Sequence, residues 1–172
     1  MRTAALLPTA GDPLLARYWL NNYRQTWARE VDELLVYVNG DEAGTPIYEA
    51  AGAKIVGSTP QRLIHGVALT ELVNATDADA VVLMEDDAFV RTPGAMRQRL
   101  ERVYLRHDDV IGCPRGGMSP ELHKAAEEKG GEITGPDTSY GHGLWPCFLF
   151  ARPGDLRYLA DIRYESITWP AG

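Results

Sequence analysis

The sequence predicts an α/β fold in three layers, with a mostly parallel central sheet between helices. Three observations support this prediction. Short apolar segments alternate with segments of helical spacing along the chain, one apolar segment is typical of a strand covered on both faces, and capping residues precede several of the helical segments. A chain of 172 residues fits one domain with a sizeable core.

The first half of the chain contains three expected strands and three expected helices. The strands are apolar runs that end in turn residues, at 3–8, 32–41 and 53–57. Asp12-Pro13 predicts a helix start, because it places a capping acid before a proline in the first turn. The face of that helix is expected to carry Leu15, Tyr18, Trp19 and Asn22. The other two helices are expected at 45–52 and from Thr59-Pro60, the latter with Leu63, Val67, Ala68 and Leu72 at helical spacing.

The second half continues the alternation with three more strands. They are expected at 78–87, 109–114 and 144–151. Between them, Thr92-Pro93 starts a helix with Met96, Leu100, Val103 and Tyr104 inward, and Ser119-Pro120 caps a charged helix through Lys129. A short helix is expected from Pro153.

Three adjacent acids follow the most apolar of these strands, in the stretch VVLMEDDAFV at 81–90. Ligands of open α/β sheets bind outside the carboxyl ends of the strands, where Glu85, Asp86 and Asp87 are expected. On an extended chain Glu85 and Asp87 would share one side while Asp86 faces the other. Such carboxylates suit Mg²⁺ or Mn²⁺, and Mg²⁺ binds through one or two carboxylates plus substrate phosphates. The competing interpretation is a solvated strand end.

Composition limits the other classes of function. The net charge of −7 without a block of Lys and Arg argues against broad nucleic-acid binding. Two cysteines, Cys113 and Cys147, match no zinc or redox spacing. No apolar run approaches the roughly 20 residues of a membrane-spanning helix, and Pro8 and Asp12 come too early for a signal peptide, so a cytoplasmic location is expected.

Three segments carry a resemblance to a known family. The stretch VVLMEDDAFV resembles the acidic metal-binding motif of nucleotide-sugar glycosyltransferases with the GT-A fold, and its E-D-D form resembles the lipopolysaccharide and procollagen galactosyltransferase family as well as family-2-like glycosyltransferases. HGVALTEL at 65–72 is similar to the G-x-A-L-S-H helix of the galactosyltransferase family, with Glu71 where His is expected. YGHGLWPCFLFARPGDL at 140–156 is similar to a later strand of such enzymes.

The resemblance implies roles for a set of residues. Asp87 would coordinate a divalent metal, Mn²⁺ or Mg²⁺, that bridges the diphosphate of a UDP- or GDP-sugar, and Glu85 or Asp86 would contact the ribose or the metal and its waters. The nucleotide would be met by residues near the first three strands: Thr9, Asn39, Asp41, Arg62 and His65. Purely structural roles stay open for these residues, since Asn39-Gly40-Asp41 also fits a turn and Arg62 also fits a solvated helix residue.

The acceptor side is less defined. His142, between two glycines, is a candidate metal ligand or acceptor contact. The candidate bases are Asp137, Asp161 and Glu165, with Asp137 preferred because its Gly/Pro-rich loop is expected to close over the donor. The acceptor class stays open between glycan, protein and lipid. The chain would be one GT-A-like catalytic domain with a donor part at about 1–90 and an acceptor side at about 91–172, although its short end also fits a fragment or a site completed by a partner.

The predicted function is therefore that of a metal-dependent, hexosyltransferase-like glycosyltransferase acting on an acceptor hydroxyl. Two alternatives remain. One is a sugar-nucleotide-binding or structural module of the same fold without catalysis. The other is a sugar nucleotidyltransferase, which PTAGDPLLAR at 8–17 disfavours because it has one Gly and no Lys.

Overall fold

The computed structural model describes residues 1–63, 65–106, 111–114, 132–133, 144–156 and 167–168. Within them, six strands form the main sheet: β1 (Thr3–Thr9), β2 (Glu33–Asn39), β3 (Lys54–Thr59), β4 (Ala80–Met84), β5 (Ile111–Pro114) and β7 (Leu144–Ala151). Their order across the sheet is β3-β2-β1-β4-β7-β5. Two short strands, β6 (Glu132–Ile133) and β8 (Ile167–Thr168), pair with each other in a separate antiparallel ribbon.

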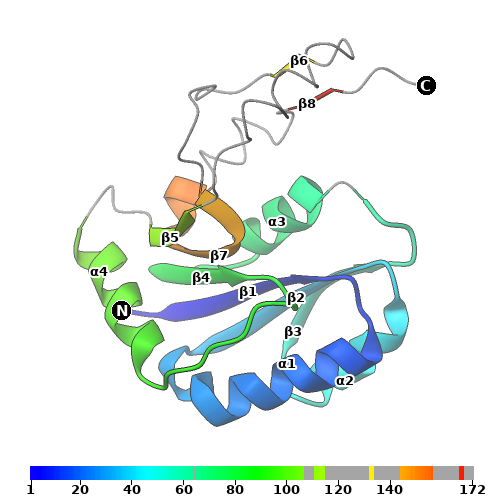
Figure 1. Ribbon diagram of the computed structural model, residues 1–172, viewed down its shortest axis with the longest axis horizontal. Helices are drawn as coiled ribbons and strands as arrows, with labels where there is room; N and C mark the ends of the chain where they lie inside the picture. The colour runs from blue at the N-terminus through cyan, green and yellow to red at the C-terminus, as the bar shows by residue number, and fades with distance from the viewer. Residues whose placement is uncertain (64, 107–110, 115–131, 134–143, 157–166, 169–172) are drawn as a thin grey trace.

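Helices cover both faces of this sheet (Figure 1). They are α1 (Pro13–Thr26), α2 (Thr45–Glu49), α3 (His65–Asn74) and α4 (Ala95–Leu105), with the 3-10 turns η1 (Ala28–Glu30) and η2 (Glu42–Gly44). Residues 153–156 are also helical, as expected from Pro153. The side chains of α1, α2 and α4 pack in one apolar cluster on one face, and those of α3 pack in another on the opposite face.

Strand β4 shows how the two clusters share the sheet. Val82 and Met84 belong to the cluster under α1 and α4, whereas Val81 and Leu83 belong to the cluster under α3. Each of these four side chains is at most 2% exposed. A strand buried on both faces needs a continuous apolar run, which the sequence has.

The direction of the strands confirms the predicted fold class. β1 pairs in parallel with β2 and β4, and β2 pairs in parallel with β3. β7 is the exception, because it runs antiparallel to both β4 and β5. The sheet is therefore mostly parallel and flanked by helices.

The first helix begins where the sequence predicts it. The Asp12 carboxylate accepts hydrogen bonds from the backbone N–H groups of Leu14 and Leu15, both at 2.8 Å, and Pro13 follows the cap. The expected face was partly wrong. Trp19 is buried, but Tyr18 is 61% exposed.

Two other helices begin later than predicted. α3 starts at His65 and not at Thr59-Pro60, because β3 continues to Thr59 and residues 60–63 form a loop. Leu63 and Val67 are consequently 40% and 43% exposed, although Ala68 and Leu72 are buried as expected.

The start of α4 is fixed by a residue distant in sequence. Glu30 accepts hydrogen bonds from the backbone N–H groups of Gly94 and Arg97, each at 2.7 Å, so it caps the helix from η1. The predicted start at Thr92-Pro93 was therefore wrong, since the capping acid comes from elsewhere in the chain. Val103 is buried as predicted, whereas Tyr104 is 40% exposed. The helix expected from Ser119-Pro120 to Lys129 lies outside the described residues.

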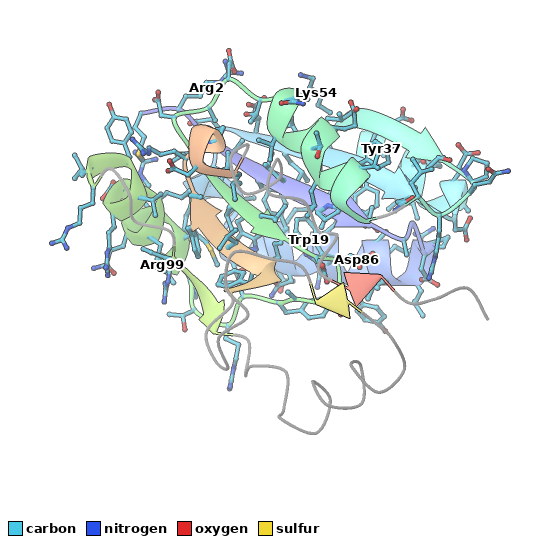
Figure 2. All side chains as sticks on the ribbon, turned by 90° about the horizontal axis from the view of Figure 1, so that it is seen from above. Arg2, Trp19, Tyr37, Lys54, Asp86 and Arg99 are labelled. Carbon is cyan, nitrogen blue, oxygen red and sulfur yellow. The ribbon has the colours of Figure 1, made fainter. Side chains whose placement is uncertain are left out.

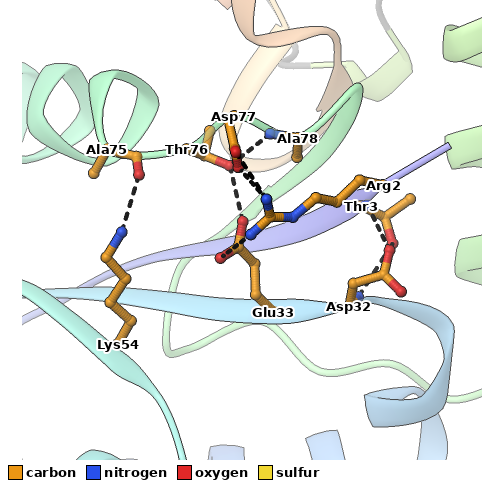
Figure 3. Close-up of polar contacts among 9 residues, drawn as sticks. All are labelled: Arg2, Thr3, Asp32, Glu33, Lys54, Ala75, Thr76, Asp77 and Ala78. Carbon is orange, nitrogen blue, oxygen red and sulfur yellow. Dashed lines mark hydrogen bonds and ion pairs between the residues drawn. The ribbon is translucent and has the colours of Figure 1, made fainter.

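Polar contacts tie the strand starts together at the amino edge of the sheet (Figure 3). The Arg2 guanidinium donates to Asp77 at 2.8 Å and to Glu33 at 3.4 Å. The Thr3 backbone N–H donates to Asp32 at 2.7 Å and holds the pKa of that carboxyl below its usual value of 3.8. The exposed contacts of Arg2 contribute modestly to stability. All of these contacts mark the edge opposite to the one that carries the acidic stretch.

Two loops at the carboxyl edge meet through glycine backbone. Gly11, after β1, has φ of +82°, and a Cβ there would lie 1.8 Å from the carbonyl oxygen of Asp41. Gly44 packs from the other side, where a Cβ would lie 2.3 Å from the carbonyl oxygen of Gly11. The loop after β1 is thus locked against η2 and α2, and this contact leaves no room for a side chain.

Replacing Gly11 by Ala should therefore lower the free energy of unfolding by about 3 kcal/mol, because the new methyl group must displace backbone and adopt a positive φ. Gly52→Ala is the matched control. Gly52 has φ of +83° with nothing within 4 Å of a built Cβ, so it should lose only about 1 kcal/mol. Urea denaturation of both variants measures the difference, and equal losses would contradict the close contact with Asp41.

Candidate functional site

A pocket of about 290 Å³ opens where the order of the strands reverses. The chain passes from β1 outward to β2 and β3, then returns to place β4 on the other side of β1. The gap between the carboxyl ends of β1 and β4 is such a switch point, where open α/β sheets bind ligands. The pocket is lined by Pro8, Thr9, Ala10, Asn39, Arg62, Leu63, Glu85, Asp86 and Asp87.

The three acids lie in a turn and not on the strand. β4 ends at Met84, and the Ala88 backbone N–H donates to the Glu85 carbonyl at 3.1 Å. The prediction that β4 extends to residue 87 was therefore wrong, and the alternation of an extended strand does not apply to these acids. Asp86 is only 8% exposed, whereas Glu85 is half-buried and Asp87 is exposed.

Asp86 ties the end of β4 to the end of β1. The hydroxyl of Thr9 donates to the Asp86 carboxylate. The two residues are 77 positions apart in sequence, the same separation as between the paired residues Leu6 and Leu83 of β1 and β4. The backbone N–H of Ala10 is a second donor to the same carboxylate. This buried hydrogen bond therefore spans the two sides of the switch point. Figure 2 shows Asp86 at the opposite edge of the sheet from Arg2.

The Thr9 hydroxyl is part of a larger buried network. It accepts from the Gly11 backbone N–H at 2.9 Å and from the Tyr48 hydroxyl at 3.2 Å, while it donates to Asp86. Thr9 is 4% exposed and Tyr48 is fully buried. A hydroxyl has one proton and two lone pairs, so all the capacity of Thr9 is used inside the protein.

Burial dominates the electrostatics of this network. It raises the pKa of Asp86, the hydrogen bonds from Thr9 and Ala10 oppose that rise, and the neighbouring charge of Asp87 adds to it. Burial also raises the pKa of Tyr48 to about 12. A cation held beside Asp87 would further offset the repulsion between the adjacent carboxylates.

The opposite wall of the pocket is held by Asn39. Its amide donates to the Leu63 carbonyl at 3.0 Å and its oxygen accepts from the Leu63 N–H at 2.7 Å. These two bonds fix the loop that carries Arg62. The Arg62 side chain lies against Gly40, where a Cβ would be 3.4 Å from its Cγ and Nε.

A second asparagine holds the chain that leaves the acidic turn. Asn22 on α1 donates to the Val90 carbonyl at 2.8 Å and accepts from the Val90 N–H at 2.9 Å. Together with the Glu30 cap, this contact anchors the segment between the turn and α4. Asn22, Glu30 and Tyr48 support the site but carry no local sequence signal, because their partners lie 39 to 68 residues away.

The structure brings together six of the predicted site residues: Thr9, Asn39, Arg62, Glu85, Asp86 and Asp87. Asp41 is not among the pocket residues. Its carboxylate accepts from the Ala43 N–H at 2.9 Å and caps η2, which agrees with the turn interpretation.

Several predictions fall outside what the structure describes. His65 begins α3, but its side chain is not described, and the same holds for the side chains of Cys113 and Cys147. Asp137 and His142, like the alternative bases Asp161 and Glu165, lie outside the described residues.

The described residues would fit a metal site whose coordination is completed by a bound substrate. Among them, no group of three or more His, Cys, Asp or Glu side chains is arranged to hold a metal ion. Glu85 and Asp87 line the pocket, while Asp86 is engaged by Thr9 and Ala10. Two carboxylates completed by phosphate oxygens and water are a donor set that Mg²⁺ accepts.

No helix in the described part of the chain is both long and apolar enough to cross a membrane. No family model matches the sequence, and no curated protein matches it.

Solved structures share the fold. Glucosyl-3-phosphoglycerate synthase from Mycobacterium tuberculosis in complex with UDP is similar at a TM-score of 0.59 and 19% identity, over 89% of this chain and 57% of that one. Its complex with Mn²⁺, UDP and glucosyl-3-phosphoglycerate gives a TM-score of 0.60 and 20% identity over the same shares. CMP:2-keto-3-deoxy-manno-octonic acid synthetase complexed with CTP gives 0.59 and 14%, over 94% of this chain and 78% of that one.

These similarities confirm the predicted GT-A fold. At identities of 14% to 20% they do not assign a family, so the resemblance to the lipopolysaccharide and procollagen galactosyltransferases stays a prediction. The chain spans 57% of the length of the glucosyl-3-phosphoglycerate synthase that it matches.

The two adjacent aspartates should respond differently to truncation without metal. Asp86→Ala leaves the Thr9 hydroxyl and the Ala10 N–H without their acceptor, so we expect a loss of about 1.5 kcal/mol in the free energy of unfolding, after part is offset by removal of a buried charge. Asp87→Ala removes an exposed carboxylate and should change it by less than about 0.5 kcal/mol. Chemical denaturation in the presence of a chelator measures both. A larger loss of unfolding free energy in Asp87→Ala than in Asp86→Ala would contradict the assignment of Asp86 as the buried, structural member of the pair.

Proposed function

We propose that this protein is a metal-dependent glycosyltransferase that takes a sugar from a nucleoside diphosphate donor. One observation carries the proposal: a buried central strand of a GT-A fold is followed directly by Glu85-Asp86-Asp87, and these acids line a pocket at the switch point of the sheet. Support comes also from the solved structures, since an enzyme of the same fold was crystallised with Mn²⁺ and UDP.

Asp87 and Glu85 are the proposed ligands of Mn²⁺ or Mg²⁺. Both residues line the pocket, where Asp87 is exposed and Glu85 is half-buried, and this supports the assignment. When bound, the metal would supply Lewis-acid stabilisation of the departing diphosphate and a template for it. Asp86 would keep the turn in place through Thr9 and Ala10.

The charge of the pocket supports a metal-bound donor over a bare one. Three carboxyl groups, Glu85, Asp86 and Asp87, face one guanidinium, Arg62, among the lining residues. A diphosphate would meet net repulsion in this environment unless a divalent cation came with it. Arg62, on the opposite wall, would then contact a phosphate through its planar fork or stack on the base.

The proposed roles on the nucleotide side follow the contacts. The amide of Asn39 is engaged with Leu63, so we propose that it shapes the wall of the pocket and leaves direct contact with the nucleotide to Arg62 and the backbone near Ala10. Acceptor activation is assigned to Asp137, with His142 as a further ligand or acceptor contact, from the sequence alone.

A second candidate is a sugar nucleotidyltransferase. The observation in its favour is the similarity to the CTP complex of CMP:2-keto-3-deoxy-manno-octonic acid synthetase, which covers 78% of that chain. The loop after β1 argues against it, because residues 8–17 contain one Gly and no Lys. The two activities differ in the substrate consumed, a sugar nucleotide or a nucleoside triphosphate.

The test uses UDP- and GDP-sugars, and CTP, each with and without Mn²⁺, followed by thermal shift and by donor hydrolysis. We expect stabilisation of the protein by a UDP- or GDP-sugar only when Mn²⁺ is present, with loss in Asp87→Asn because a neutral amide is a weaker metal ligand. Glu49→Gln, a carboxylate on α2 that is not among the pocket residues, is the control and should bind normally.

Three results would contradict the proposal. Equal stabilisation with and without Mn²⁺ would mean that donor binding does not require the metal. Metal-dependent binding and turnover of CTP with a free sugar would assign the nucleotidyltransferase. Binding of a sugar nucleotide without metal and without turnover would indicate a binding module.

A further inference from the structure

Tyr48 lies behind the acidic turn and is part of its support. It is on α2, an element that contributes no residue to the lining of the pocket, and its side chain is fully buried. Its hydroxyl donates to the Thr9 hydroxyl at 3.2 Å. Thr9 in turn donates to Asp86, so a line of buried hydrogen bonds runs from α2 through β1 to the acidic turn.

The Tyr48 hydroxyl fixes the direction of this line. The Thr9 oxygen has two lone pairs, and the Gly11 N–H at 2.9 Å and the Tyr48 O–H at 3.2 Å fill them. The Thr9 proton is then directed to the Asp86 carboxylate. Because burial raises the pKa of Tyr48 to about 12, its hydroxyl keeps its proton at ordinary assay pH.

Tyr48 is itself held in a fixed position. Its ring belongs to the apolar cluster that contains Ala16 and Val38. The start of α2 is pressed against the loop after β1, since a Cβ at Gly44 would lie 2.3 Å from the Gly11 carbonyl oxygen. A ring packed in this way keeps its hydroxyl in a fixed place and can therefore restrain Thr9, whereas an exposed tyrosine could not.

We propose that Tyr48 is a positioning residue of the acidic turn, which acts through Thr9 and Asp86 to hold Glu85 and Asp87 in the geometry that binds a divalent cation. The inference rests on the proposed function only for the identity of the ligand. Asp86 lies between the two proposed ligands in sequence, so fixing its carboxylate fixes the backbone of the turn, including the bond from the Ala88 N–H to the Glu85 carbonyl at 3.1 Å.

The test is a double-mutant cycle on Tyr48→Phe and Thr9→Val, read by titration with Mn²⁺ alone. Tyr48→Phe keeps the ring and should weaken Mn²⁺ binding about fivefold, as expected for one hydrogen bond. Thr9→Val should weaken it at least as much, and the double variant should be no weaker than Thr9→Val, because Tyr48 acts through the Thr9 oxygen. Thr9→Ser retains the hydroxyl and should retain the affinity.

Tyr23→Phe is the matched control. Tyr23 also loses one hydroxyl in this variant, its pKa is also raised by burial, and its ring packs between Trp19 and Trp27, but it does not line the pocket. It should bind Mn²⁺ as the wild type does. A loss of stability without a loss of affinity is the signature of a structural role, so the comparison separates the two.

A second measurement keeps the inference testable if the metal hypothesis fails. Absence of Mn²⁺ binding to the wild type, both alone and in the presence of UDP or GDP, would contradict the proposed function, and hydrogen exchange of the Ala88 amide then decides the role of Tyr48. Faster exchange in Tyr48→Phe, by about fivefold, with no change in Tyr23→Phe supports positioning. Unchanged Ala88 exchange, or Tyr48→Phe and Thr9→Val effects that add fully in the double variant, would overturn it.

Discussion

The hydrogen bond between Thr9 and Asp86 is the contact on which the rest of the site depends. It joins the end of β1 to the turn that follows the neighbouring strand β4, at the point where the strand order reverses. Tyr48 and the Gly11 N–H support it from one side, and Ala10 supports it from the other. A buried carboxylate is costly unless it is hydrogen-bonded, and the bonds from Thr9 and Ala10 to Asp86 supply that compensation.

This contact gives the three adjacent acids different environments. All three line the pocket, but Asp86 is only 8% exposed, whereas Glu85 is half-buried and Asp87 is exposed. The two asparagine contacts, Asn39 with Leu63 and Asn22 with Val90, then fix the wall opposite the turn and the segment that leaves it. The pocket is therefore bounded by loops that are held from rigid elements, which suits the proposed binding of a metal-bound anion.

The sequence predicted what local patterns encode. The continuous apolar run of β4 and the Asp12-Pro13 cap of α1 were confirmed. Predictions failed where a distant partner decides the local structure. The start of α4 depends on Glu30, the loop before α3 depends on Asn39, and the inward turn of Asp86 depends on Thr9, 77 residues away. Tyr48 could not be found from sequence for the same reason, because only the fold brings α2 behind β1.

The most direct test of this account is to locate a bound cation by paramagnetic broadening of backbone amide signals during titration with Mn²⁺. The account predicts the strongest broadening at Asp86–Ala88 and Ala10, with loss of the effect in Asp87→Asn. Broadening centred on Asp77 and Asp79, which line a second pocket at the amino edge, would contradict it. So would broadening at the acidic turn that survives Asp87→Asn.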